Sequence, residues 1–323
     1  MLCRYLLILC LLGVAVNALN RKVLFVGNSY TKGNNLPNLV KSLASNGGHN
    51  LEQSQHTVGG ATMGNHAENG AVLSKIQSKR WDYVVLQAQS QEGAQSQGYV
   101  NFILRSYARD ISEQVRENNA CSDPMFFMTW GRQYSDDFDA YVEMDDKIRQ
   151  AYIGMGEDNE APVAPVGVVW RYLRLNHPEI TLYTRDGSHP SYAGSYAAAA
   201  TFYTMIFQDD PTKLSFRGSL NAGSARKIRA AVKTVLFGSG MNNWVPQMLN
   251  FTAVTNGLTV QLESPNVKSD SYAWRTSDGA TFGDSPQASH TFASPGTYTV
   301  SLTKTYCRRS FLPFQSDIYV GDE

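Results

Sequence analysis

A serine near the start of the chain and a histidine about 160 positions later have the types suited to nucleophilic chemistry. Ser29 follows an apolar stretch in the run Gly27-Asn28-Ser29-Tyr30, and His189 stands in Asp186-Gly-Ser-His189-Pro. A hydroxyl nucleophile needs a base within hydrogen-bond reach, and the base needs a partner that fixes its tautomer. An aspartate three residues before the histidine can supply that partner from one turn. Each run alone also fits a helix cap or a plain turn.

Two further loops hold groups that could stabilise a developing negative charge on oxygen. Gly59 and Gly60 follow a strand predicted at 52–58, and glycine lets the backbone come close to a reacting atom, so that the Gly60 amide could donate to it. Gln87 and Gln89 follow or end a strand predicted at 81–87. A side-chain amide at that point offers N–H donors without a charge. A plain loop is the alternative in both places.

The elements that must position these residues are predicted by the spacing of apolar residues. Short apolar runs predict strands, and apolar residues spaced by three and four predict helices between them. The strands are expected at 23–27, 83–87, 125–130 and 163–170, and the helices at 35–47, 100–119 and 191–207. This alternation is typical of a parallel sheet covered by helices. The chemical residues then gather at the carboxyl ends of strands, where open α/β sheets place their sites.

Over residues 22–208 the order serine, glycine, amide, Asp-x-x-His resembles the sequence blocks of the SGNH, or GDSL-like, hydrolase superfamily. The resemblance implies a three-layer, flavodoxin-like α/β sandwich with Ser29 as nucleophile, His189 as base and Asp186 as its orienting acid. It also implies an oxyanion hole made by the amides of Ser29 and Gly60 and the side chain of Gln89.

The third block departs from the family pattern, which usually reads Gly-x-Asn-Asp. Here Gln87-Ala-Gln89-Ser90 occupies that position, so the side-chain donor would be a glutamine, Gln89 if the loop has equal length and Gln87 as the fallback. Asn28 stands where aspartate is commoner. The implied reaction is hydrolysis of carboxylic esters through an acyl-enzyme, and it requires no cofactor and no metal.

Some carbohydrate esterases of the superfamily also have a glutamine in the third block, and this shared variation indicates the substrate class. We expect O-acetyl or similar acyl groups on carbohydrate. The aromatic residues Trp130, Tyr134, Trp170 and Tyr172 could line a sugar pocket or simply belong to the core. The alternatives are a lipase or thioesterase with the same triad, and a catalytically silent extracellular protein that binds glycans or mediates adhesion.

From about residue 250 the sequence pattern changes. Apolar and polar residues alternate with a period of two in segments rich in Thr, Ser, Val and Tyr, which predicts short strands. Tyr272-Ala-Trp274, Ser277-Asp-Gly279 and Pro295-Gly-Thr-Tyr298 resemble a PKD domain, an all-β sandwich of the immunoglobulin-like type. The resemblance makes Trp274 the core tryptophan. Such modules serve as spacers or as weak units for contact with polysaccharide or a surface.

The first 20 residues have the pattern of a secretory leader, with a positive charge at Arg4, an apolar run at 6–16 and small residues before a cleavage point after Ala18. A buried helix or a membrane anchor is the alternative, but the run is short for a span. We therefore expect a secreted protein without a membrane span. The expected domains are a signal peptide at 1–18, an SGNH-type hydrolase domain at 19–210, a helix and linker at 211–247, and a PKD-like domain at 248–323.

The charge balance and the cysteines limit which other functions and which cellular compartment the sequence allows. Lys plus Arg and Asp plus Glu are both 28, and the absence of a basic block argues against nucleic-acid binding. Cys121 and Cys307 could pair in an oxidising compartment or remain two separate buried thiols. Asn250 begins a glycosylation acceptor pattern. The acidic run at 136–146 reads as a solvated helix face.

Overall fold

The computed structural model describes most of the chain, namely residues 18–133, 137–238, 244, 251–264, 269–307, 309–310 and 313–321. The predicted leader up to residue 17, Tyr134 of the aromatic set and the glycosylation acceptor Asn250 lie outside the described residues.

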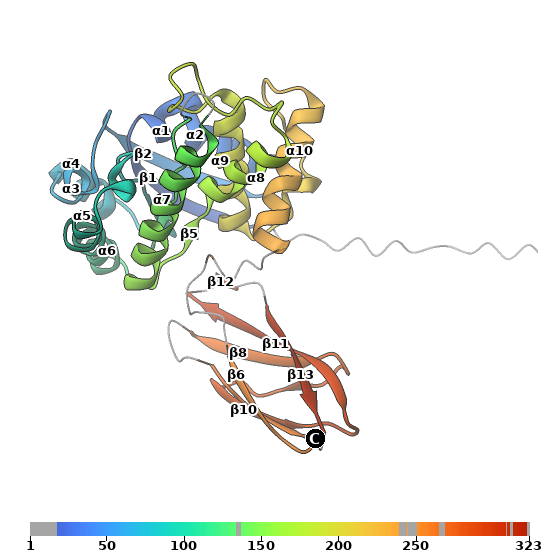
Figure 1. Cartoon of the computed structure of the whole chain (residues 1–323). Coiled ribbons are helices and arrows are strands. Elements are labelled where there is room, and N and C mark those ends of the chain that lie inside the picture. Colours follow the sequence, from blue (N-terminus) through green and yellow to red (C-terminus); the bar gives the residue numbers. More distant parts are fainter. Residues whose placement is uncertain are drawn as a thin grey trace, which may run out of the picture.

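A parallel sheet forms the centre of the N-terminal part (Figure 1). Its strands are β1 (Asn20–Gly27), β2 (Asn50–Thr57), β3 (Tyr83–Leu86), β4 (Asp123–Phe127) and β5 (Val163–Ala164). They lie in the order β2-β1-β3-β4-β5, and every adjacent pair is parallel. This is the flavodoxin-like, doubly wound order. β3 and β4 are buried throughout, as strands covered on both faces must be.

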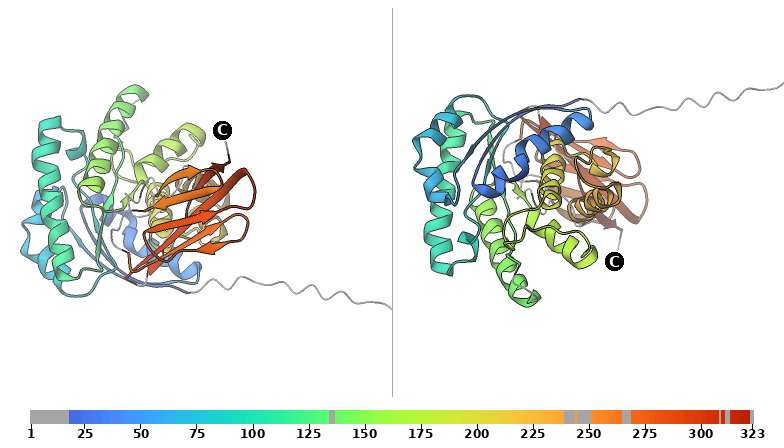
Figure 2. Two further views of the ribbon diagram at one scale, coloured as in Figure 1. Left: turned by 90° about the horizontal axis from the view of Figure 1, so that it is seen from below. Right: turned by 90° about the horizontal axis from the view of Figure 1, so that it is seen from above.

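Helices lie on both sides of this sheet, as the two views of Figure 2 show. One side carries α2 (Leu36–Asn46), α8 (Val166–Asn176), α9 (Tyr192–Phe207) and α10 (Ala222–Lys233), and the other carries α3 (Met63–Ala67), α4 (Gly70–Gln77), α6 (Arg105–Asn118) and α7 (Phe138–Asp158). The predicted three-layer α/β sandwich is confirmed. No helix in the described part of the chain is long and apolar enough to cross a bilayer.

Short helical segments complete this part of the fold. They are α1 (Ser29–Lys32), η1 (Gly33–Asn35), η2 (Glu92–Ala94), α5 (Gln97–Tyr99), η3 (Val100–Leu104), η4 (Pro211–Lys213) and η5 (Thr234–Gly238). Two of them, α1 and η2, carry residues of the candidate site.

The run at 163–170 is not one strand, so that prediction is wrong. β5 ends at Ala164, and α8 begins at Val166, directly after Pro165. Proline has no N–H to donate to a sheet but suits the start of a helix. Val166, Val169 and Trp170 then recur at helical spacing and are fully buried. A short apolar run does not by itself distinguish a buried strand from a buried helix.

The C-terminal part is an all-β sandwich of two antiparallel sheets, so the predicted fold class is confirmed here as well. One sheet has the order β10-β7-β6, and the other has the order β12-β11-β8-β9 with β13 paired to β11. The strands are β6 (Thr252–Asn256), β7 (Thr259–Glu263), β8 (Ser271–Thr276), β9 (Thr281–Phe282), β10 (Gln287–Thr291), β11 (Gly296–Tyr306), β12 (Arg309–Ser310) and β13 (Phe314–Val320). Trp274 is fully buried between Val260, Val300 and other apolar residues.

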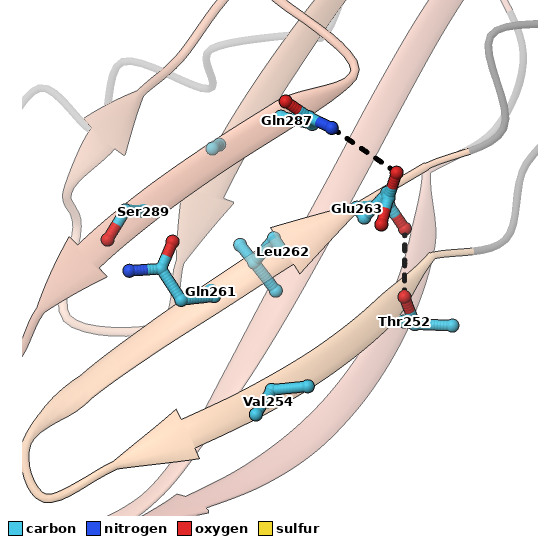
Figure 3. A pocket seen from close by; sticks show the side chains of 8 residues that line it. Thr252, Val254, Gln261, Leu262, Glu263, Gln287 and Ser289 are labelled. Carbon is cyan, nitrogen blue, oxygen red and sulfur yellow. Dashed lines mark hydrogen bonds between the residues drawn. The ribbon is translucent and has the colours of Figure 1, made fainter.

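The three-stranded sheet has a shallow hollow of about 440 Å³ on its outer face (Figure 3). Its rim is largely polar, and Gln287 donates to Glu263 across neighbouring strands. The side chains labelled there are Thr252, Val254, Gln261, Leu262, Glu263, Gln287 and Ser289.

A disulfide joins the two parts of the chain. Cys121 pairs with Cys307, with their Cα atoms 5.6 Å apart, and the Tyr306 hydroxyl donates to the Ala120 carbonyl at 2.7 Å. Of the two alternatives for these cysteines, the structure has the pair. Cys121 precedes β4, so the bond lies at the amino end of that strand, on the sheet edge opposite to the loops that hold the candidate site.

Candidate active site

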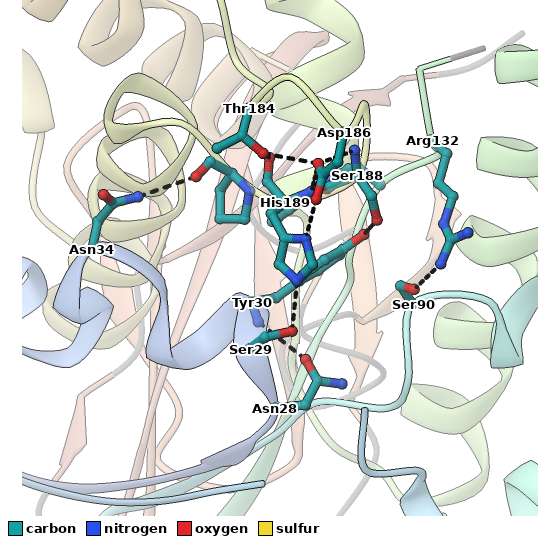
Figure 4. Close-up of polar contacts among 12 residues, drawn as sticks. Asn28, Ser29, Tyr30, Asn34, Ser90, Arg132, Thr184, Asp186, Ser188 and His189 are labelled. Carbon is teal, nitrogen blue, oxygen red and sulfur yellow. Dashed lines mark hydrogen bonds and ion pairs between the residues drawn. The ribbon is translucent and has the colours of Figure 1, made fainter. Parts of the chain in front are cut away.

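Ser29, His189 and Asp186 meet at the carboxyl edge of the parallel sheet (Figure 4). Oγ of Ser29 lies 2.9 Å from Nε2 of His189, and Nδ1 of His189 lies 2.5 Å from Oδ2 of Asp186. Ser29 begins α1 directly after β1, whereas the other two come from the loop before α9. The structure therefore brings together the three side chains named from the sequence, in the order that proton transfer from a hydroxyl requires.

The buried side chains of Asn28 and Gln87 hold the turn that carries Ser29 in place. The Asn28 amide donates to Oε1 of Gln87 at 3.1 Å, and Nε2 of Gln87 donates back to Oδ1 of Asn28 at 2.8 Å. The same Oδ1 caps α1 by accepting from the Tyr30 amide. A side chain at Gly27 would collide with Thr31 and Gln87, which explains the glycine at this position.

Gln87 is fully buried, and its amide is used within the protein. Its Nε2 donates at 2.8 Å both to Asn28 and to the Ala88 carbonyl, while its Oε1 also accepts from the Thr31 hydroxyl at 2.8 Å. Both N–H donors of the side chain are thus occupied. Gln87 therefore has no free N–H to offer as the alternative oxyanion donor. Its hydrogen bonds instead hold the turn that carries Ser29.

Gly60 and Gln89 lie in the two loops that border the same turn. Gly60 is exposed with φ +70°, and the carbonyl of the next residue, Ala61, accepts from Nδ2 of Asn28. The half-buried Gln89 accepts from the Gln91 amide through Oε1 at 2.7 Å. Among the described residues no hydrogen bond engages Nε2 of Gln89, so its donors can point to a ligand.

Glu92, which the sequence analysis did not single out, ties these two loops together. Its buried carboxylate accepts from the Gln89 amide at 2.7 Å and from the Met63 amide at 2.9 Å, both through Oε2. Oε1 accepts from the Tyr99 hydroxyl at 2.9 Å. Burial raises the pKa of Glu92, and these three hydrogen bonds oppose that rise. The one acidic residue between Tyr83 and Tyr99 was the available signal in the sequence.

The loop of Asp186 and His189 is held mainly by its own hydrogen bonds. Oδ1 of Asp186 accepts from the amides of Ser188 and His189, both at 2.9 Å, and from the Thr184 hydroxyl at 2.8 Å. Desolvation raises the pKa of Asp186, but these bonds and the His189 ring outweigh it and hold the pKa well below its usual range. The carboxylate therefore stays charged beside the imidazole. Gly187 has φ +65° and approaches the Gln133 carbonyl too closely for any side chain.

Stacked aromatic rings support the site from beneath. Tyr30 stacks on Trp130 at 4.6 Å, and Trp130 stacks on Trp170 at 3.7 Å. The Tyr30 hydroxyl lies 2.7 Å from Oγ of Ser188, and its ring meets His189 edge-on. Because Trp130 and Trp170 are fully buried, they do not line a sugar pocket, and the core interpretation of these two residues is the correct one.

Comparisons with known proteins give the fold of the two parts. The family model for the PKD domain matches residues 246–306. A DUF4886 family protein from Bacteroides uniformis is similar in structure, with a TM-score of 0.57 and 15% identity over 69% of this chain and 98% of that chain. No curated protein matches the sequence.

Lower structural similarity, at a TM-score of 0.44, is found with two further solved structures. One is a mutant acetyl-xylooligosaccharide esterase from Geobacillus stearothermophilus, 13% identical over 61% of this chain and 97% of that chain. The other is a lipase/acylhydrolase from Enterococcus faecalis, 16% identical over 62% of this chain and 100% of that chain. The N-terminal part thus has a flavodoxin-like α/β fold with the strand order β2-β1-β3-β4-β5, which the DUF4886 family protein shares, and residues 246–306 of the C-terminal part match the PKD domain.

Proposed function

We propose that the protein is a secreted serine esterase that removes O-acetyl or similar short acyl groups from carbohydrate. The observation that carries the proposal is the continuous contact from Ser29 through His189 to Asp186. A hydroxyl, an imidazole and a carboxylate in this order form the machinery of acyl transfer on several unrelated folds.

The reaction begins when Ser29 attacks the ester carbonyl and Nε2 of His189 takes the hydroxyl proton. Asp186 keeps the imidazole in the tautomer with its proton on Nδ1 and stabilises the imidazolium. His189 then gives the proton to the departing alkoxide, which leaves an acyl group on Ser29. Water, deprotonated by the same imidazole, attacks the acyl carbon, and the carboxylic acid departs as Ser29 recovers its proton.

The negative charge on the tetrahedral oxygen needs fixed donors. The amides of Ser29 and Gly60 and the side chain of Gln89 fill this role in the proposal. Glu92 supports it indirectly, because it fastens the backbone at Gln89 to the start of α3, just after the Gly60 turn. Donors held by such bonds need no reorganisation as the charge develops.

Short acyl groups on a polar alcohol fit the surroundings better than long acyl chains do. The polar side chains of Thr184 and Ser188 lie beside the triad (Figure 4). The large apolar rings, Trp130 and Trp170, lie buried beneath Tyr30 and offer no surface to a chain. A lipase or thioesterase would need an apolar groove for its acyl chain.

The disulfide and the C-terminal domain support the remaining parts of the proposal. A bond between Cys121 and Cys307 fits an oxidising compartment outside the cytoplasm, which is consistent with a leader at 1–18. The described residues that line the hollow of Figure 3 include no aromatic ring, and sugar-binding faces commonly stack on such rings. We therefore assign the PKD domain the role of a spacer, with polysaccharide contact as the alternative.

Hydrolysis of 4-nitrophenyl esters of increasing chain length tests the proposal directly. The wild-type protein should prefer acetate, and Ser29→Ala and His189→Ala should each lose about 10⁴-fold or more in kcat. A fluorophosphonate probe should label the wild-type protein and leave Ser29→Ala unlabelled. Near-wild-type rates in either variant, or a folded wild-type protein that is neither labelled nor active, would favour the catalytically silent glycan-binding alternative. A preference for long chains would favour a lipase or thioesterase.

A further inference from the structure

Arg132 brings a guanidinium to the edge of the site from the loop that follows β4. Its Nη2 donates to Oγ of Ser90 at 3.1 Å, and Ser90 adjoins the candidate oxyanion donor Gln89 (Figure 4). Burial raises the pKa of Tyr30, while Ser188, Ser90 and Arg132 act in the opposite direction, so the guanidinium also adjoins the Tyr30 hydroxyl. Tyr30 directly follows the nucleophile. The cation is therefore near the place where a substrate must lie.

This cation has no counter-charge in the described part of the chain. Arg105 pairs there with Asp158, and Arg171 pairs with Asp145, whereas no described carboxylate lies within ion-pair distance of Arg132. Nε of Arg132 is moreover buried without a hydrogen-bond partner. Leaving this buried donor without a partner costs free energy, and the half-buried guanidinium gains no ion pair to offset the cost. A protein tolerates such a cost most readily where a ligand completes the pairing.

The backbone around Arg132 is fixed before any ligand arrives. The Gly131 amide donates to Oδ1 of Asp145 at 3.0 Å, and the Gln133 amide donates to the Gly187 carbonyl at 2.7 Å, within the loop of the base. Asp145 is almost fully buried, so it is not part of the solvated face expected for the acidic run. Instead it helps to position the arginine. A side chain on so constrained a segment loses little entropy when it binds.

We propose that Arg132 recognises a carboxylate on the substrate, and that the natural substrates are acylated acidic saccharides. The inference rests on the proposed esterase function and narrows its substrate class. A guanidinium offers parallel N–H donors whose spacing matches the two oxygens of a carboxylate, which gives both affinity and orientation. Among the described residues Asp186 forms its ion pair with His189, and no ion pair joins it to Arg132.

The test compares acetate release from O-acetylated methyl hexuronosides with release from the same compounds carrying a carboxamide in place of the carboxylate. The wild-type protein should prefer the free acid by about ten- to hundred-fold in kcat/KM, chiefly through KM. Arg132→Gln should abolish this preference and leave the rates on the carboxamide and on 4-nitrophenyl acetate nearly unchanged. Arg132→Lys should retain part of it, because the charge remains without the planar fork. Arg109→Gln, which removes the same charge from the exposed face of α6, is the matched control and should retain all of it.

Equal losses on acid, carboxamide and nitrophenyl acetate in Arg132→Gln would overturn the proposal, because they indicate a structural or oxyanion role. A wild-type protein without preference for the acid would overturn it as well. If the variant fails to fold, inhibition of the wild-type protein decides, since the unacetylated methyl hexuronoside should inhibit about tenfold more strongly than its carboxamide. Failure of the esterase function itself gives a different result, the absence of hydrolysis with every ester, and this would remove the inference too.

Discussion

The turn of Ser29 and the loop of Asp186 and His189 are held in opposite ways. Asn28 and Gln87, which fasten the turn, are 2% and 0% exposed and neutral. The side chains of Asp186 and His189 are 49% and 45% exposed, and Asp186 carries a charge. One half of the site is thus part of the core, and the other half is a surface loop fastened largely to itself.

Because of this difference, changes in one half of the site should affect mainly stability, and changes in the other half should affect mainly activity. Removing a buried amide leaves its partners without hydrogen bonds in a place that water does not reach, so the cost falls on the free energy of unfolding. Changing an exposed carboxylate costs the fold little, because solvent screens it and replaces its contacts. Changes in the two halves should therefore give different balances of lost activity and lost stability.

Among variants that leave Ser29 and His189 in place, Asp186→Asn should have the largest effect, and the effect should be on activity. An asparagine neither fixes the tautomer with its proton on Nδ1 nor supplies the negative charge that stabilises the imidazolium. The kcat on 4-nitrophenyl acetate should therefore fall by about 10³- to 10⁴-fold. The free energy of unfolding in urea should change by less than about 1 kcal/mol, because Oδ1 of an asparagine can still accept from the Ser188 and His189 amides and solvent screens the exposed position. A large loss of stability with this variant would show that the exposed loop is as much a part of the core as the turn.

Gln89→Ala should follow, with a loss of about a hundred-fold or more in kcat and little change in KM. The half-buried side chain supports the fold through one hydrogen bond to the Gln91 amide, so thermal stability should change little. Unchanged kcat in a folded Gln89→Ala protein would remove this residue from the oxyanion hole.

Gln87→Ala, two residues away, should give the reverse balance. The change leaves Asn28 and Thr31 without their buried partner and should lower the free energy of unfolding by about 2–4 kcal/mol. Urea unfolding measures this loss directly. Gln97→Ala, which removes an exposed glutamine that donates to Asn101, is the matched control and should leave the free energy of unfolding nearly unchanged. Lost activity with unchanged stability in Gln87→Ala would instead indicate contact with the substrate.

The smallest expected effect is the contribution of Glu92 to the pH dependence of stability. Burial penalises the charged carboxylate and raises its pKa, so the penalty is complete above that pKa and disappears below the ordinary value of about 4.3. The stability of the wild-type protein relative to Glu92→Gln should therefore rise as the pH falls through this window. Thermal unfolding of both proteins across the acid range measures the difference. An opposite slope would mean that the three hydrogen bonds to Glu92 outweigh its burial.

The sequence was sufficient to predict the elements whose signal is local. β1 and β3 appear as apolar runs, and β11 appears as alternation from Gly296 to Tyr306, because each pattern depends only on which face of the element is buried. The same holds for the Asp-x-x-His loop, in which the hydrogen bonds that Asp186 accepts come from residues no more than three positions away.

The parts that escaped prediction depend on contacts between distant segments. The engagement of the Gln87 amide depends on Asn28, which lies 59 residues earlier in the chain and binds Gln87 but not Gln89. The role of Glu92 likewise depends on Met63 from another loop. The unpaired state of Arg132 is visible only when its neighbours in space are known. Spacing along the chain carries no information about such partners.

The cross-link between Cys121 and Cys307 changes what a break in the backbone would do. A single cleavage anywhere between these residues leaves both pieces in one covalent molecule until a reductant is added. Digestion alone would therefore not detach the sandwich, whereas digestion followed by reduction would. Because the cross-link lies at the edge of the sheet away from Ser29, the C-terminal domain stays attached to the opposite edge and leaves the approach to Ser29 open.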